Sequence, residues 1–418
     1  MSVSAQVSAL APFSVRSFRF QWPADLATSW AFEMETLILG WYVLVETKSV
    51  LMLTIYASLQ YVGTLLAPMF GVMGDRVGHR NVLCAMRALY ALLAMSLMTL
   101  AFMDAVTPMI VLVIAAMLGL VRPSDLGMRA ALVGETMPPA QLMGAMSIQR
   151  TTQDSARIAG ALTGAGLVAT LGMGPAYAVI VCFYVTSLLL TRHAGIAHPA
   201  QTKNAVDAPP VSPWRELREG LHYVWQAPQL RAAMLFAFLL NLTAFPLFTG
   251  LMPYVAKEVY GADQGTLGTM VAAAATGALT GSIIMTRFGG AFRPARAMIM
   301  FGIAWLVMLL VFVQTESPAT GIPVLIFAGC MQTMGLIPNN ALLLRTSDQR
   351  YRGRIMGIRM MAIYGNLPGL LLGGQLIANY GYKAMATGYC LFGIVFAVLI
   401  ALHWRRHLWQ SGAAANLR

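Results

Sequence analysis

Long apolar runs recur along the chain, and short segments rich in polar residues, glycine or proline separate them. Twelve runs are long enough to cross the ~30 Å hydrocarbon layer of a bilayer as helices. Breakers such as Pro108, Gly172 and Gly381 stand where helices are expected to end. The pattern predicts an all-α polytopic membrane protein with twelve transmembrane helices, at residues 22–45, 49–73, 81–103, 107–133, 142–170, 173–191, 230–251, 264–286, 296–315, 320–344, 355–379 and 382–404.

One long polar segment interrupts this pattern at residues 194–228. It contains several prolines and then WRELREGLHYVW, whose apolar residues recur at helical spacing. This piece is typical of an amphipathic helix lying on the inner membrane face. The chain is therefore predicted to form an N-terminal six-helix bundle (1–193), a cytoplasmic linker (194–228) and a C-terminal six-helix bundle (229–418).

The two halves are related by an internal repeat. At an offset of 209 residues, GALTGAGLVATLG (160–172) aligns with GLLLGGQLIANYG (369–381), and three of the glycines match. Small residues in spanning helices allow close helix approach, so glycine matches alone are weak evidence. The same frame also aligns Arg150 with Arg359, which favours two pseudo-symmetric bundles. Parallel repeats with a binding site between them are a transporter architecture.

Composition and charge agree with a membrane protein. Of the 418 residues, 58% are hydrophobic and 11% charged, which excludes an ordinary soluble globule. In the loops, basic residues gather on the side that holds the N-terminus, and only Lys48, Lys257 and Lys383 fall on the other. This asymmetry predicts cytoplasmic N- and C-termini in the inner (plasma) membrane, and it accounts for the net charge of +12 without a nucleic-acid partner.

No metal or cofactor site is expected from the sequence. The cysteines, Cys84, Cys182, Cys330 and Cys390, lie in apolar runs without metal-ligand spacing, and they are expected to be small buried hydrophobes. The P-loop pattern GxxxxGK[ST] is missing, so ATP is not expected to drive this chain. The intramembrane acids face arginines rather than a nucleophile and base, which argues against an enzyme.

The segment MFGVMGDRVGHRN (69–81) resembles the GxxxDRxGRR signature of the major facilitator superfamily, in the expected place between spans two and three. DQRYRGRIMGIR (348–359), GWYVLV, MRAALVGETMP and ARIAGAL are similar to the drug:proton antiporter branch that contains macrolide efflux proteins and the enterobactin exporter. The antiporter-type GPxxG of span five reads Gly160-Ala161-Leu162-Thr163-Gly164 here. The resemblance implies the major facilitator fold, a monomer, and a cytoplasmic gate formed by Gly71, Asp75, Arg76, Gly78 and Arg80.

Charged residues stand deep within three predicted spans. Glu33 and Glu35 lie ~16–20 Å along the helix from Trp22, near mid-membrane. Two triads share a helix face each, Arg122/Asp125/Arg129 in span four and Arg150/Asp154/Arg157 in span five. Each triad carries +1 and the glutamates carry −2, so the eight groups sum to zero. The glutamates are therefore expected to be counter-charges for these arginines.

Two interpretations of this charge cluster compete. It either only joins helices, or one glutamate gains and loses a proton as its distance from an arginine changes. Residues i and i+2 point ~160–200° apart on a helix, so both glutamates cannot face a cavity equally. The polar stripe shared with Thr28 and Tyr42 favours Glu35 as the acid that faces the cavity.

The predicted function is secondary active transport by alternating access, as a proton-coupled exporter of small amphiphilic molecules such as drugs or metabolites. The expected partners are a small-molecule substrate, protons and the lipid bilayer. A siderophore exporter, a lysophospholipid carrier, a proton-coupled uptake symporter and a membrane-embedded sensor remain alternatives. Methionine is frequent, with 29 residues, and suits loosely specified ligands. Candidate substrate contacts are Trp30, Tyr42, Tyr61, Phe245, Asn340 and Arg359.

Overall fold

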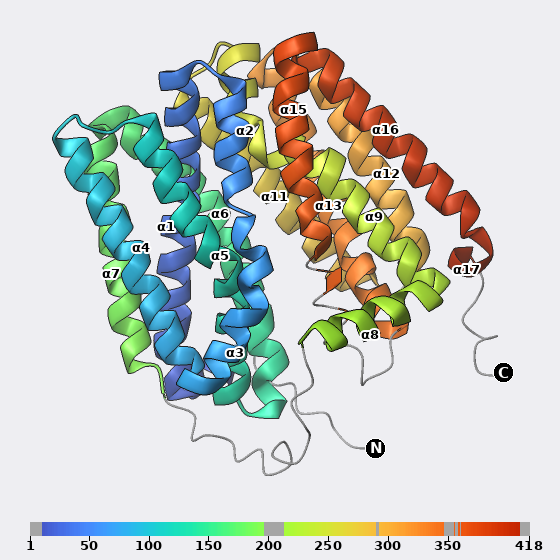
Figure 1. Ribbon diagram of the computed structural model, residues 1–418, viewed down its shortest axis with the longest axis horizontal. Coiled ribbons are helices and arrows are strands. Elements are labelled where there is room, and N and C mark those ends of the chain that lie inside the picture. Colours follow the sequence, from blue (N-terminus) through green and yellow to red (C-terminus); the bar gives the residue numbers. More distant parts are fainter. Residues whose placement is uncertain are drawn as a thin grey trace. The chain divides into compact units, whose positions relative to one another are not determined.

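The computed structural model describes residues 11–195, 213–289, 292–346, 355, 358, 359 and 361–409. This part of the chain is helical, without strands, and it divides into two compact units (Figure 1). Unit 1 comprises Met1–Thr47 and Val62–Asp207, and unit 2 comprises Lys48–Tyr61 and Ala208–Arg418. By its contacts, the segment around residues 48–61 thus belongs with the C-terminal helices. The predicted bundle limits at residues 193 and 229 stay predictions.

Unit 1 consists mostly of long helices joined by short turns. Its elements are η1 (Ala11–Ser14), α1 (Arg16–Thr47), η2 (Val62–Leu66), α3 (Ala67–Val77), α4 (His79–Phe102), α5 (Pro108–Thr136), α6 (Pro139–Leu171) and α7 (Met173–His193). Thr107 starts α5 by accepting a hydrogen bond from the backbone N–H of Ile110. Gly172, with φ of +84°, makes the turn from α6 to α7, a conformation that a residue with a Cβ avoids.

Unit 2 holds the remaining elements. They are α2 (Val50–Leu59), α8 (Pro213–Gln226), α9 (Pro228–Phe245), η3 (Pro246–Gly250), α10 (Met252–Tyr254), η4 (Val255–Val259), α11 (Gln264–Phe288), α12 (Pro294–Val313), α13 (Pro318–Thr346), η7 (Ala362–Gly365), α15 (Asn366–Tyr380), α16 (Tyr382–His403) and α17 (Arg405–Trp409). The helix expected in the linker is present as α8. Most of the apolar side chains that suggested it, Trp214, Leu217 and Leu221, lie outside the described part.

Eight helices of the described chain are long and apolar enough to cross a membrane: α4, α5, α7, α9 with η3, α11, α12, α13 and α16. Four predicted spans are not in this set. The helices α1 and α6 have sufficient length, 32 and 33 residues, but carry many polar and charged side chains. The helix α15 has 15 residues and directly follows η7, and residues 355–361 of that predicted span are only partly described.

The prediction of one unbroken helix over residues 49–73 was wrong. This segment consists of α2, η2 and α3, with a break after Leu59. Gly63 follows this break, and a Cβ there would lie 2.1 Å from the carbonyl oxygen of Leu120 in α5. The chain approaches α5 too closely at this point for a side chain to fit. The expectation that all four cysteines are buried was also wrong, since Cys182 is exposed on α7.

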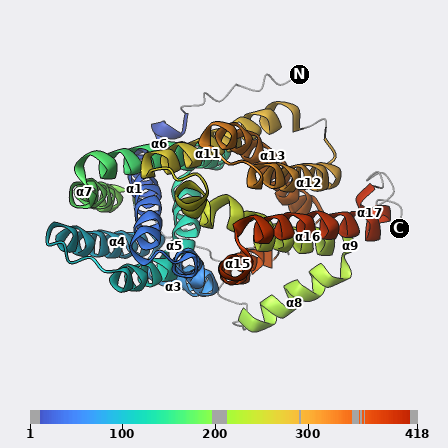
Figure 2. The same ribbon diagram turned by 90° about the horizontal axis from the view of Figure 1, so that it is seen from above.

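In unit 2, glycines allow α11 and α13 to pack backbone to backbone (Figure 2). A Cβ on Gly329 would lie 2.0 Å from the carbonyl oxygen of Ala274, and one on Gly277 would lie 1.9 Å from that of Ile326. Real Cβ atoms do not approach carbonyl oxygens so closely, so a side chain at either position must push the helices apart.

We therefore expect Gly329→Ala to destabilise the protein by about 1–3 kcal/mol through overpacking. Gly388→Ala in α16 is the matched control, because a Cβ there meets no atom within 4 Å. Thermal unfolding of both variants in detergent checks this. Equal melting temperatures for the two variants would contradict the backbone contact.

Asp263 begins α11 as its N-cap. Its carboxylate accepts hydrogen bonds from the backbone N–H and the hydroxyl of Thr266, both at 2.8 Å, and these bonds lower the pKa of the carboxyl. Asp263→Ala is expected to cost about 1 kcal/mol of stability at neutral pH. Because the folded pKa is depressed, this contribution is present above the unfolded pKa and is lost as the pH falls through the folded pKa. Unfolding measured at neutral pH and well below pH 4 should show the variant approaching the wild type only in acid.

Candidate functional site

Helix α1 lies against α5, α6 and α7 within unit 1. Three acidic side chains of α1 contact neighbouring helices of unit 1. Asp25, Glu33 and Glu35 organise three groups of contacts, which we call the Asp25 cluster, the Glu33 pair and the Glu35 cluster.

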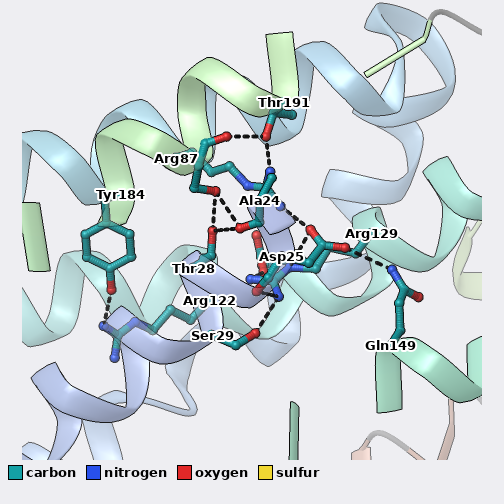
Figure 3. Close-up of polar contacts among 12 residues, drawn as sticks. Ala24, Asp25, Thr28, Ser29, Arg87, Arg122, Arg129, Gln149, Tyr184 and Thr191 are labelled. Atoms are coloured by element: carbon teal, nitrogen blue, oxygen red, sulfur yellow. Dashed lines mark hydrogen bonds and ion pairs between the residues drawn. The ribbon is translucent and has the colours of Figure 1, made fainter. Parts of the chain in front are cut away.

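In the Asp25 cluster, one carboxylate joins four helices (Figure 3). Asp25 on α1 is only 3% exposed, and its Oδ1 accepts a hydrogen bond from Arg87 of α4. Its Oδ2 accepts from the side-chain amide of Gln149 on α6 at 3.0 Å. The guanidinium of Arg129 on α5 lies 3.7 Å from Oδ1 and also donates to the backbone carbonyl of Asp25 at 3.2 Å. The cluster therefore fixes α1, α4, α5 and α6 at one depth.

Arg129 is shared between two carboxylates. It forms an ion pair with Asp125 one turn earlier on α5, and it donates to the hydroxyl of Ser29 at 2.8 Å. Arg129 and Asp125 are both buried. Arg87 is fully buried and also donates to the hydroxyl of Thr191 on α7. Each buried charge of this cluster thus has an oppositely charged partner, the arrangement that makes burial tolerable.

The Glu35 cluster lies about three turns further along α1. Glu35 has no exposed surface, and its Oε2 accepts from Arg122 of α5 and, at 2.9 Å, from the hydroxyl of Tyr184 on α7. The guanidinium of Arg122 also lies 3.9 Å from the ring centroid of Phe32, a cation–π contact. The expectation that Glu35 is the acid facing an open cavity was therefore wrong, because neighbouring helices of unit 1 enclose it.

The Glu33 pair joins α1 to α6 and retains access to the surface. Arg157 Nε lies 3.4 Å from Glu33 Oε1, and the side chains are 42% and 20% exposed. Gly160 on α6 makes this approach possible, because a Cβ there would lie 2.7 Å from the Cβ of Glu33. Gly164 packs in the same way against Met34. The glycines of the GALTG segment therefore bring α6 close enough to α1 for the ion pair to form.

The second expected triad is only partly buried. Asp154 of α6 is 5% exposed and pairs with Arg150 at 3.2 Å, whereas Arg150 is 62% exposed. In both triads, the aspartate pairs with the arginine four residues away. Asp25 and Arg87 add one charge of each sign to the eight expected groups. Five acids and five arginines, all in unit 1, still sum to zero.

The corresponding polar contact in unit 2 is neutral. Asn366 of α15 donates to the side-chain oxygen of Asn241 on α9 at 2.9 Å. Nearby, a Cβ on Gly369 would lie 2.3 Å from the backbone oxygen of Leu242. Gly369 is the repeat partner of Gly160, so the same glycine brings the same pair of helices together in each half. Among the described residues, this helix contact is therefore an ion pair in unit 1 and a neutral hydrogen bond in unit 2.

The signature segment forms the turn from α3 to α4. Gly78, with φ of +95°, connects the two helices, and Arg80 donates to the backbone carbonyl of Ala194 at 3.4 Å. Gly71 and Arg76 lie on α3, with Arg76 exposed. His79 meets Glu135 at the end of α5 at 2.6 Å, a contact the sequence did not suggest. The side chain of Asp75 and most of the 348–359 segment lie outside the described residues, so the gate stays a prediction.

The candidate substrate contacts differ in their surroundings. The indole N–H of Trp30 donates to the hydroxyl of Thr163, and the hydroxyl of Tyr42 donates to the backbone carbonyl of Val106, both at 2.8 Å. Both polar groups are thus used inside unit 1. Phe245 packs edge-on against buried Trp305, with ring centroids 5.1 Å apart. Tyr61, Asn340 and Arg359 are partly buried in unit 2. A role in substrate binding stays a prediction for all six.

Asp25 and Arg87 are the residues that the sequence pattern missed. Taking the first span to begin at Trp22 places Asp25 in its first turn, at the depth of lipid headgroups. The helix begins at Arg16, so Asp25 lies ~14 Å inside it. The available signal was Asp25 near the start of the first predicted span and Arg87 as the single charged residue of the predicted span at 81–103. A charged residue in a membrane helix is a functional or structural marker.

Comparison with known proteins decides the family. The profile of the Major Facilitator Superfamily matches residues 10–365 and, separately, residues 234–412. The chain belongs to the Major Facilitator Superfamily. It is accordingly a multi-pass membrane transporter of small molecules rather than an enzyme. No curated protein matches the sequence of this chain significantly.

Solved transporter structures share the fold. A point mutant of the nucleoside transporter NupG superposes with a TM-score of 0.76 at 12% identity, over 92% of this chain and 99% of that chain. The POT family transporter PepTSo gives 0.73 at 13% identity, over 95% and 99%. A bacterial homologue of the human lysosomal transporter Spinster gives 0.70 at 11% identity, over 95% and 99%. At these identities, the likeness shows the fold alone.

Proposed function

We propose that the protein is a proton-coupled exporter of small amphiphilic molecules, with twelve spanning helices in two six-helix bundles and both termini in the cytoplasm. The superfamily and the fold support secondary transport. The drug:proton antiporter branch is supported by the signature and branch-like segments of the sequence. The loop arginines support the orientation through the positive-inside rule.

The Glu33 pair is the observation that carries proton coupling. Both partners keep exposed surface. We infer that this surface faces water, because a charged pair in contact with lipid is costly. A carboxylate next to a guanidinium stays charged, whereas one that is buried without its partner binds a proton. If alternation between the two faces of the membrane changes the distance between Glu33 and Arg157, it also loads and unloads a proton. We assign the proton-exchange role to Glu33.

The other two clusters suit a structural role. Asp25 and Glu35 are almost completely buried, and each is held by arginine and at least one further hydrogen-bond donor. Separating either carboxylate from its arginine leaves an uncompensated buried charge, which is strongly unfavourable. Helix joining, the alternative interpretation of the charge cluster, thus applies to these groups rather than to the Glu33 pair.

Transport into sealed vesicles tests the proposal. The purified protein is reconstituted with an entrapped pH indicator, and a fluorescent amphiphilic cation is added under an imposed proton gradient. The proposal predicts dye movement against proton movement, abolished by a protonophore. Movement of dye and protons in the same direction would instead favour an uptake symporter. Dye binding without any flux would favour a sensor. If only nucleosides or peptides were transported, the substrate class would instead be that of the nucleoside or peptide transporters that share the fold.

A further inference from the structure

A groove on unit 2 lies apart from the charge clusters of unit 1. It runs between α12 and α16 and ends at α17, with a volume of about 980 Å³, at the upper end of the range for small-molecule sites (~300–1,000 Å³). Its walls are apolar and include Met300 and Ile303 of α12 and Leu402 of α16. Its end is different, because Arg405, Arg406 and Trp409 of α17 line it.

The two arginines at this end are positive without local compensation. The sequences of α12, α16 and α17 contain no aspartate or glutamate. Arg405 and Arg406 are exposed, and neither forms an ion pair with any residue that the structure describes. Neighbouring like charges repel each other, and an anion between them relieves that repulsion.

The helix α17 is held in place, so the arginines keep their position at the groove. Gln229 of α9 donates to the backbone carbonyl of His407 at 2.7 Å, and Arg296 of α12 donates to that of Trp409 at 3.0 Å. Leu408 anchors the turn with only 3% of its surface exposed. The groove end is therefore a built part of unit 2 rather than a loose extension of α16.

Aromatic residues place this end at the level of the membrane interface. Trp404 directly precedes α17, and Trp225 lies in the last turn of α8. The guanidinium of Arg231 lies 5.9 Å from the ring centroid of each. Trp is enriched where the hydrocarbon layer meets the headgroups, and Lys and Arg are enriched in the adjoining cytoplasmic loops. The apolar walls of the groove consequently extend from headgroup depth into the hydrocarbon layer.

We propose that this groove binds one anionic phospholipid, with its phosphate between Arg405 and Arg406 and its acyl chains along α12 and α16. Basic pockets at the ends of spanning helices are a recognised setting for anionic headgroups. The long apolar walls favour a lipid over a free phosphate, which has nothing to place against Met300, Ile303 and Leu402.

Binding of a defined lipid to the full-length protein tests this. Delipidated protein in detergent is titrated with phosphatidylglycerol or phosphatidylcholine in mixed micelles, and bound lipid is counted by native mass spectrometry. The proposal predicts preferential retention of phosphatidylglycerol, reduced at least about tenfold in Arg405→Gln/Arg406→Gln. Arg218→Gln/Arg345→Gln is the matched control, since both arginines are exposed in unit 2 and neither lines the groove.

A second variant and a soluble probe separate the remaining outcomes. Ile303→Trp fills the apolar part while both arginines stay, and it should also release phosphatidylglycerol. Glycerol phosphate at the same concentration should not bind. The proposal is overturned if both lipids bind equally, if the arginine variant binds like its control, if glycerol phosphate replaces the lipid, or if the groove is covered by a second copy of the chain on native mass spectrometry.

Discussion

Replacing Asp25 by asparagine is expected to destabilise the protein by about 3–5 kcal/mol, the cost of breaking a buried ion pair by removing one partner. The asparagine keeps the size of the side chain but loses the charge that balances Arg87 and part of that on Arg129. Both guanidinium groups remain enclosed, with Arg87 having no exposed surface. Thermal unfolding in detergent, together with the yield of monodisperse protein, measures the effect.

Two comparisons make this result specific. Asp104→Asn, in the exposed loop between α4 and α5, changes the same chemical group without a buried partner and should leave the melting temperature nearly unchanged. In a double-mutant cycle, Asp25→Asn with Arg87→Met should be less destabilised than the sum of the single variants, because the pair is removed together. Additive losses would contradict direct pairing of Asp25 with Arg87.

Arg122→Gln is expected to cause a loss of similar size, about 3–5 kcal/mol, since it leaves Glu35 buried without a cation. The hydroxyl of Tyr184 remains as a hydrogen-bond donor to Glu35 but cannot neutralise its charge. Arg122→Lys should recover part of the loss by restoring a positive charge, although it cannot also stack over Phe32 in the same planar geometry.

Arg150→Gln is the control for this second prediction. Arg150 also pairs with a carboxylate, but it is 62% exposed, and exposed ion pairs contribute only about 0–1 kcal/mol. Thermal unfolding should therefore show a large loss of stability for Arg122→Gln, a partial loss for Arg122→Lys and a small loss for Arg150→Gln. A loss for Arg150→Gln as large as that for Arg122→Gln would show that burial does not set the cost.

The sequence was sufficient to predict the class of protein and most helix ends. Long apolar runs identify spanning helices because lipid cannot satisfy an exposed backbone. Gly172 and Gly381 were recognised as turns, and both have a positive φ that favours glycine. The pairing of Glu33 and Glu35 with arginines of α5 and α6 followed from charge balance, because an isolated charge in a bilayer is expensive.

Three features required the folded chain. The second span is broken after Leu59, and its apolar pattern indicates neither the break nor how near the carbonyl of Leu120 lies to Gly63. The direction in which Glu35 points depends on how α1 is rotated against α5 and α7. Glu33 and Glu35 point to opposite sides of α1, so the sequence alone does not determine this rotation. Asp25 was hidden because the helix extends six residues further toward the N-terminus than the apolar run.

Substrate-dependent proton flux in Glu33→Gln and Glu35→Gln vesicles tests the central claim most directly. Dye counterflow without a proton gradient is measured beside it, so that loss of coupling is distinguished from loss of binding or folding. The Glu33 assignment predicts that Glu33→Gln exchanges dye but moves no protons, whereas folded Glu35→Gln remains coupled. Full coupling in Glu33→Gln, with the dye still driven uphill by a proton gradient, would contradict it.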